Sequence, residues 1–267
     1  MENLFNENKV HELIHTTSIG KLNSILKGLV GQSFPLITIS DADVLFLNDW
    51  QKESYKVFNA FPKAGIVSTT PNSKMVKYLT GPVLIDNFFS KSLQFTSVLN
   101  PKAMQSFADS VGNNQLFKEV HLEKYFTISS PNNQKAVVGA GHFVATYKSE
   151  VFKTIKHKNS EFSLGGNSEF KILDEPVLNS NLWRLSTENN YTYHLGNSLE
   201  DWMLRLVEKT SNYESTEIEM PNLIIKKMNN FTKWIKINIL VKTLMKRSIW
   251  RLFIQYKGLT KEEARIY

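Results

Sequence analysis

The stretch that decides the fold reads Pro35-Leu36-Ile37-Thr38-Ile39-Ser40-Asp41-Ala42-Asp43-Val44-Leu45-Phe46-Leu47. Its apolar first half, rich in β-branched residues, predicts a buried strand over residues 35–40. Two carboxylates, Asp41 and Asp43, stand at the carboxyl end of that strand. Ionised carboxylates that leave water need compensation, and a divalent cation is a strong partner for them. A solvated turn explains a lone Asp-x-Asp as simply, because aspartate favours turns.

Helices and strands alternate on both sides of this stretch. Apolar residues between 22 and 29 repeat at helical spacing and predict a helix that stops near Gly31. A second helix is predicted between a cap at Asn48-Asp49 and a stop at Pro62, with its apolar side over residues 50–61, and a strand follows over residues 64–68. This alternation is typical of an α/β domain with a mainly parallel, Rossmann-like sheet flanked by helices. Ligands of such sheets bind at the carboxyl ends of the strands, where Asp41 and Asp43 fall.

Three later segments complete a pattern that begins with Gly20-x-x-Asn23 and Ser40-Asp41-Ala42-Asp43. They are Val137-Val138-Gly139-Ala140-Gly141-His142-Phe143-Val144, Leu173-Asp174-Glu175-Pro176-Val177-Leu178 and Tyr193-His194-Leu195-Gly196-Asn197. In this order the segments resemble a GT-A-type glycosyltransferase, nearest to family 2, over roughly residues 9 to 200. The resemblance implies a GT-A-like fold. It also implies metal-dependent, inverting transfer of a sugar from a nucleotide-diphosphate donor to a saccharide or polysaccharide acceptor.

The resemblance also implies a role for each matching residue. The implied sites are a donor site at Gly20, Asn23, Asp41 and Asp43, an acceptor side at Gly141 and His142, and a Mn²⁺ or Mg²⁺ site at Asp41, Asp43 and His194. The acidic pair would supply the catalytic base. Its order, Asp174-Glu175, is the reverse of the usual Glu-Asp. Alignment by position therefore favours Glu175 and alignment by residue type favours Asp174; we expect Glu175.

The Asp-x-Asp segment arrives early for that family. About two βα units, each on the order of 30 residues, would precede it. We therefore expect an N-terminally shortened GT-A-like domain over residues 1–220. An open sheet edge in such a domain favours self-association or a partner chain. The alternative from another functional class is a non-catalytic GT-A-like fragment, a binding module that lacks the donor site.

The amino-acid composition excludes several kinds of site but does not identify the reaction. The 267 residues are 42% hydrophobic, enough for a substantial core. Cysteine is absent, which excludes disulfides, thiolate zinc sites and cysteine nucleophiles. Any metal is then held by oxygen and imidazole, a donor set that suits Mn²⁺ or Mg²⁺. The polar opening residues carry no secretory signal, and no apolar run reaches the ~18 residues that span a bilayer, so we expect a cytoplasmic protein.

Residues 221–267 form a basic tail, predicted to be helical. Between Pro221 and Thr260 the chain has no acidic residue and nine basic ones: Lys226, Lys227, Lys233, Lys236, Lys242, Lys246, Arg247, Arg251 and Lys257. Aromatic and aliphatic residues lie between them, which is typical of a segment on an anionic membrane surface, here the inner face. A helix packed on the domain explains the pattern equally well. No nucleic-acid motif accompanies the charge, so we expect no nucleic-acid partner.

The polar stretch from Asn100 to Gln134 has the composition of an irregular insertion. One short helix is predicted in it, over residues 102–111. His121 is expected at its surface. Long insertions of this kind usually have a function, and selection of the acceptor is our hypothesis for this one.

Overall fold

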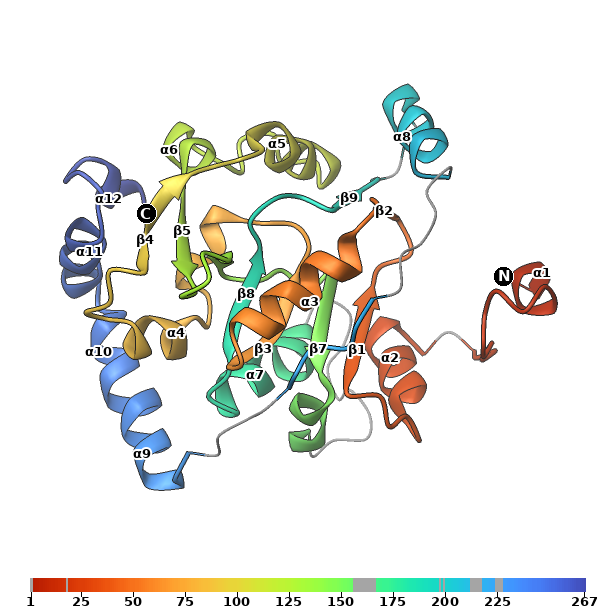
Figure 1. The fold of residues 1–267 in the computed structure, drawn as a ribbon, viewed down its shortest axis with the longest axis horizontal. Coiled ribbons are helices and arrows are strands. Elements are labelled where there is room, and N and C mark those ends of the chain that lie inside the picture. The colour runs from red at the N-terminus through yellow and green to blue at the C-terminus, as the bar shows by residue number, and fades with distance from the viewer. Residues whose placement is uncertain are drawn as a thin grey trace.

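The computed structural model describes residues 2–17, 19–155, 167–196, 198, 200–211, 218–223 and 228–267. Three positions named above, Asn197, Lys226 and Lys227, lie outside the described residues. Figure 1 shows a central twisted sheet with helices packed against it. The α/β class expected from the sequence is therefore confirmed.

The described residues form two sheets and a surrounding set of helices. The strands are β1 (Leu36–Ser40), β2 (Val44–Phe46), β3 (Ala64–Ser68), β4 (Leu93–Ser97), β5 (Lys124–Ser129), β6 (Lys135–Val138), β7 (Val144–Lys148), β8 (Trp183–Thr187) and β9 (Thr192–His194). The α-helices are α1 (Glu2–Asn6), α2 (Lys21–Leu29), α3 (Trp50–Ala60), α4 (Gly81–Asp86), α5 (Pro101–Ser110), α6 (Glu119–Glu123), α7 (Glu175–Asn179), α8 (Asp201–Ser211), α9 (Asn230–Ile235), α10 (Lys242–Leu244), α11 (Arg247–Tyr256) and α12 (Glu263–Ile266). Two 3₁₀ helices, η1 (Ser73–Lys77) and η2 (Ser149–Thr154), and two π-helices, η3 (Phe170–Asp174) and η4 (Lys236–Val241), complete the set.

The larger sheet is mixed and mostly antiparallel, so the prediction of a mainly parallel sheet is wrong. Its seven strands follow the order β1-β7-β3-β8-β6-β5-β4. Only β3 and β8 pair in parallel; the other five pairings are antiparallel. Strands β1 and β3 do run in the same direction, as the helix between them requires, but β7 lies between them with opposite direction. Strand β1 has a strand neighbour on one side only.

The stretch read as an irregular insertion explains much of this error. It contains α6 and β5, and β5 pairs with β4 on one side and β6 on the other. The turn from Ser130 to Gln134, closed by a hydrogen bond from Ser130 N–H to Gln134 O of 2.8 Å, is too short for a parallel crossover. His121 is only 5% exposed rather than at the surface, and its Nδ1 accepts from the Lys118 N–H at 3.1 Å. Burial, aided by the charges of nearby lysines, lowers the pKa of His121 to about 4.

Each face of the large sheet buries its own core. One cluster lies under α3, α4 and α11 and takes Trp183 and Leu185 from β8. The other lies under α2, η3 and α7 and takes Ile66 from β3 and Tyr147 from β7. Successive residues of a strand point to opposite faces, so Arg184, which pairs with Ile66 across the sheet, faces the second cluster. A charged side chain in that position is the starting point of the site described below.

The basic tail joins the first core. Leu244, Trp250, Phe253 and Ile254 are buried members of that cluster, and Figure 1 shows α9 to α12 running along the side of the domain next to α4. Lys236, a buried residue of η4, lies 2.5 Å from Asp86 of α4. The tail also keeps large apolar side chains at its surface: Phe231 (71% exposed), Trp234 (55%) and Leu252 (68%). None of the described helices is long and apolar enough to cross a bilayer.

Candidate functional site

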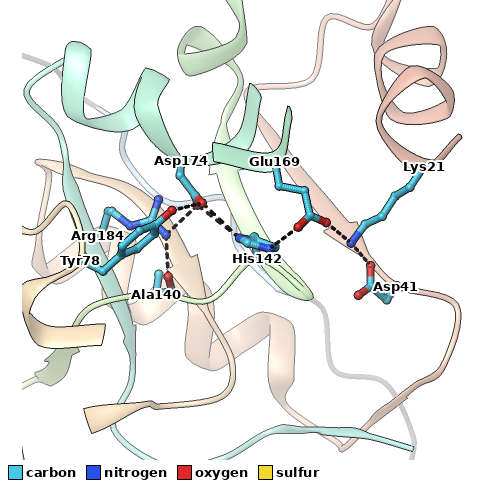
Figure 2. Close-up of polar contacts among 8 residues, drawn as sticks. All are labelled: Lys21, Asp41, Tyr78, Ala140, His142, Glu169, Asp174 and Arg184. Atoms are coloured by element: carbon cyan, nitrogen blue, oxygen red, sulfur yellow. Dashed lines mark hydrogen bonds and ion pairs between the residues drawn. The ribbon is translucent and has the colours of Figure 1, made fainter. Parts of the chain in front are cut away.

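Arg184 and Asp174 form a fully buried ion pair beneath α7. Arg184 Nη2 lies 2.9 Å from Asp174 Oδ1 and donates to the Ala140 carbonyl at 2.6 Å. Asp174 stands where η3 passes into α7, so its carboxylate points back toward the sheet (Figure 2). Tyr78 OH donates to its other oxygen at 2.9 Å. Burial opposes ionisation of Asp174, but contacts with His142, Arg184 and Tyr78 outweigh it and lower the pKa of the carboxyl.

His142 connects this buried pair to the surface. It lies in the loop between β6 and β7, with Nδ1 3.3 Å from Asp174 Oδ2 and Nε2 3.1 Å from Glu169 Oε2. Burial alone would lower the pKa of His142, but the hydrogen bond to Asp174 and the charges of both carboxylates raise it. The loop depends on Gly139, which has a φ of 115° and leaves no room for a Cβ beside the Met75 backbone.

Two further residues extend the series from Glu169 to the end of β1. Lys21, the first residue of α2, lies 2.9 Å from Glu169 Oε1 and 2.6 Å from Asp41 Oδ1. We call this series the ionic chain: Asp41, Lys21, Glu169, His142, Asp174 and Arg184 (Figure 2). Negative groups alternate with basic ones along it. Lys21 and Glu169 are its most exposed members, with 39% and 41% of the side chain exposed, whereas Asp174 and Arg184 form its dry, fully buried end. Burial opposes the charged forms of Glu169 and Lys21, but other contacts outweigh it. Asp41 and Glu169 raise the pKa of Lys21, and Lys21 and His142 lower the pKa of Glu169.

The dry end of the ionic chain contains donors with no partner among the described residues. They are Nε and Nη1 of Arg184, the hydroxyl of Tyr147 and the hydroxyl of Ser186, all buried. Burial raises the pKa of Tyr147, so its hydroxyl keeps its proton at neutral pH. Buried polar groups are almost always paired in folded proteins. A group of orphan donors beside an ion pair therefore marks this region as more than ordinary core.

Asp43 and His194 form a second, separate pair. Strand β2 pairs with β9 so that Val44 lies opposite His194, and His194 Nε2 lies 3.3 Å from Asp43 Oδ2. The Ser110 hydroxyl donates to the Phe107 carbonyl at 2.8 Å, so its oxygen is left to accept from His194 Nδ1, 3.1 Å away. In neutral His194 the hydrogen then sits on Nδ1, and Nε2 presents a lone pair to a carboxylate. Two acceptors that face each other need a proton or a cation between them.

The separation of these two acceptors fits a shared divalent cation. Adjacent ligands of an octahedral ion with bonds of 2.0–2.1 Å lie about 3 Å apart. Asp43 and His194 supply one oxygen and one imidazole nitrogen, which are donors that Mn²⁺ and Mg²⁺ accept. Within the described ranges, no group of three or more His, Asp or Glu side chains is placed to hold a metal.

The structure unites some of the predicted site residues and separates others. Asp174 meets His142, and Asp43 meets His194, but Asp41 turns away from Asp43 toward Lys21. Glu175 belongs to neither group: its carboxylate pairs with Lys171 one helical turn away, at 2.9 Å. Gly20, with a φ of 78°, is the N-cap of α2, where Asn23 donates its side-chain amide to the Ile19 carbonyl. Gly141 precedes His142 in the β6–β7 loop.

Sequence reasoning missed Lys21, Tyr78, Glu169 and Arg184. Only Arg184 carried a visible signal, because it is a lone cation within the apolar run Leu182-Trp183-Arg184-Leu185. A charge in such a run needs a buried partner. The other three residues lie in polar or helical surroundings, where charged and polar side chains are ordinary.

Comparison with known proteins adds no family to this picture. No protein-family model matches the chain, no curated protein matches its sequence, and no solved structure matches its fold. The functional argument therefore rests on the geometry of the site.

Proposed function

We propose that this protein is a metal-dependent glycosyltransferase that moves a sugar from a nucleotide-diphosphate donor to a saccharide acceptor. The observation that carries the proposal is the facing pair of acceptors, His194 Nε2 and Asp43 Oδ2, at 3.3 Å. Asp43 is two residues along the chain from Asp41, where the ionic chain begins. An enzyme of this kind needs both a cation for a diphosphate and a group that takes up a proton.

Asp43 and His194 would hold Mn²⁺ or Mg²⁺. Bound there, the cation supplies Lewis-acid stabilisation of the negative charge that builds up on the departing diphosphate. Asp41, two residues from Asp43 on the same loop, is held by Lys21. We assign Asp41 and Lys21 to the donor side, where Lys21 offers a positive charge close to the anionic donor.

Glu169 is our assignment for the proton acceptor. Of the two carboxylates considered from the sequence, Asp174 is fully buried in its contacts and Glu175 is paired with Lys171. Glu169 is the carboxylate of the ionic chain beside His142, with its side chain 41% exposed. Its lowered pKa keeps it ionised at neutral pH. It takes the proton of the acceptor hydroxyl as that oxygen bonds to the anomeric carbon and the bond to the diphosphate breaks, which inverts the anomeric centre.

His142, Lys21 and Asp174 act in this scheme by position. His142 and Lys21 each hold one oxygen of Glu169. Asp174, anchored by Arg184, holds the other side of the His142 ring. The side chains of Glu169, His142 and Asp174 are thus each held in one rotamer by a neighbour, and this keeps the reactive carboxylate of Glu169 in a fixed orientation.

One observation favours a second candidate, a non-catalytic binding module. Strand β1, which carries Asp41 at its end, has a strand neighbour on one side only. Among the described residues, the sheet therefore supports the donor side on one side of β1 only. In that case the chain binds a metal or a saccharide but transfers no sugar.

A thermal-shift experiment with Mn²⁺ tests the metal site. A cation at a hundredfold excess over its Kd adds about 2.7 kcal/mol of stability. For a chain of this size that raises Tm by roughly 5–11 °C. We expect Asp43→Ala and His194→Ala to abolish the rise. His15→Ala removes a histidine whose side chain is 74% exposed and lies 3.8 Å from Glu2 Oε1; it is the matched control and should leave the rise intact.

Release of nucleoside diphosphate from a panel of UDP- and GDP-sugars separates the two candidates. Acceptor-dependent release that is lost in both Asp43→Ala and Glu169→Gln supports the transferase. A Mn²⁺ shift with no release from any donor leaves the binding module. If millimolar Mn²⁺ does not raise Tm, the metal site and the mechanism built on it are both wrong.

A further inference from the structure

A polar pocket lies next to the Asp43–His194 pair, between α5, the end of β9 and the start of α8. Its volume is about 200 Å³. The lining side chains that matter here are Ser106, Asp109, Ser110, His194, Glu200 and Trp202. His194 thus lines the pocket and also belongs to the proposed metal site, through Nε2.

The size of the pocket restricts its ligand. Pockets for drug-sized ligands are larger, about 300–1,000 Å³. The volume is of the size that a single sugar ring needs.

The chemistry of the lining restricts the ligand further. Asp109 and Glu200 are acidic, and no lysine or arginine is among the described residues that line the pocket. Carboxylates accept hydrogen bonds from hydroxyl groups strongly and repel other carboxylates. The hydroxyls of Ser106 and Ser110 already donate to backbone carbonyls, to Lys102 O at 3.0 Å and Phe107 O at 2.8 Å, so towards a ligand they act as acceptors. The lining therefore suits an uncharged ligand rich in hydroxyl groups and disfavours an anion.

Trp202 supplies an apolar surface whose orientation is fixed. Its Nε1–H donates to Glu200 Oε2 at 2.9 Å, and its ring meets Tyr193 edge-on at 5.2 Å between centroids. Gly196 also lines the pocket and packs closely on α5, since a Cβ there would lie 2.9 Å from the Ser110 carbonyl oxygen. A held aromatic ring beside carboxylates and hydroxyls presents both an apolar face and hydrogen-bond partners to one small ligand.

From these features we infer that the pocket binds one uncharged sugar ring of the acceptor. The apolar face of the ring lies against Trp202, and its hydroxyls bond to Asp109 and Glu200. The inference rests on the proposed transferase in one respect: it identifies the ring as part of the acceptor. Binding of a sugar in this pocket follows from the pocket alone.

Fluorine NMR of the full chain labelled with 5-fluorotryptophan tests the inference directly. The chain has five tryptophans, and loss of one resonance in Trp202→Phe assigns that position. We expect glucose, galactose or N-acetylglucosamine, at millimolar to tens of millimolar concentration, to shift the Trp202 resonance and leave the other four. Glucuronate, which differs from glucose by one carboxylate, should shift it at least tenfold less effectively. Asp109→Ala should weaken binding of the uncharged sugar about tenfold.

Asp201→Ala is the matched control, because it removes an exposed acid of α8 that does not line the pocket. It should bind like the wild type. The inference is overturned if no uncharged sugar shifts Trp202, if glucuronate binds as well as glucose, or if both alanine variants behave alike. Sugar binding without a Mn²⁺ response would retain the pocket and refute the transferase; a Mn²⁺ response without sugar binding would do the reverse.

Discussion

Replacing Asp174 by asparagine is the sharpest test of the ionic chain. The substitution keeps the size of the side chain and removes its charge, which leaves the Arg184 guanidinium buried without a counter-ion. Both side chains are fully buried, and Arg184 Nη2 lies 2.9 Å from Asp174 Oδ1. Breaking a buried pair by removing one partner costs about 3–5 kcal/mol. Domains are typically stable by about 5–15 kcal/mol, so the loss is a large fraction of the total.

Urea unfolding measures this loss, because an unchanged slope shows that a shift in midpoint is a shift in stability. The double variant Asp174→Asn with Arg184→Met removes the stranded charge as well. It should recover most of the stability, since apolar replacement of a buried pair is often close to neutral. The control is Glu175→Gln, which breaks the partly exposed pair with Lys171 on the same helical segment. That change should cost no more than about 0.5 kcal/mol.

The reasoning is refuted if Asp174→Asn unfolds within about 1 kcal/mol of the wild type. It is refuted equally if the double variant is no more stable than the single one. In either case the Arg184 charge would have another partner, and the orphan atoms Nε and Nη1 would be the place to look for it.

Two further predictions follow from the described contacts. Because the pKa of His142 is raised, its contribution to stability is complete below the unfolded pKa of ~6.5 and is lost as pH rises through the folded value. The pKa of Asp174 is lowered, so its contribution has the opposite pH dependence and is lost as pH falls below ~4. Urea midpoints should therefore fall as pH rises above ~6.5, and His142→Gln should flatten that fall; an unchanged slope contradicts the assignment. Secondly, exposed Trp234 and its neighbours on the basic tail should make the protein sediment with anionic vesicles and dissociate as salt rises. Trp234→Ser should weaken this binding about tenfold. The control Val30→Ser, in the exposed connection between α2 and β1, should not weaken it. Equal sedimentation of the two variants would mean that the tail only packs on the domain.

Local elements were predictable because their signals lie within a few residues of sequence. The helix expected to stop near Gly31 is α2, and those expected over 50–61 and 102–111 are α3 and α5. The strands expected over 35–40 and 64–68 are β1 and β3. Each differs from its expected range by one residue or less at either end. Hydrophobic periodicity and glycine or proline stops suffice for such assignments.

The direction of the strands was not predictable in this way. Strand pairing joins residues far apart in the chain, such as Ile37 with Tyr147, and a single strand carries no signal for which neighbour it will take. The insertion of β7 between β1 and β3, and the hairpin from β5 to β6, turned an expected parallel sheet into a mostly antiparallel one.

By itself the sequence supplied candidates for the side chains that carry chemistry: the Asp-x-Asp pair, His142, the acidic pair and His194. Tertiary structure alone decided which of them meet. It split Asp41 from Asp43, placed Asp174 beside His142 and Glu175 away from it, and brought Lys21 and Glu169, 148 positions apart, to within 2.9 Å. The physical reason is that residue type is a local property, whereas these ion pairs depend on how α2 and η3 pack against the sheet face to which β8 contributes Arg184. Burial then set the charge state of each group, through contacts that no spacing along the chain records.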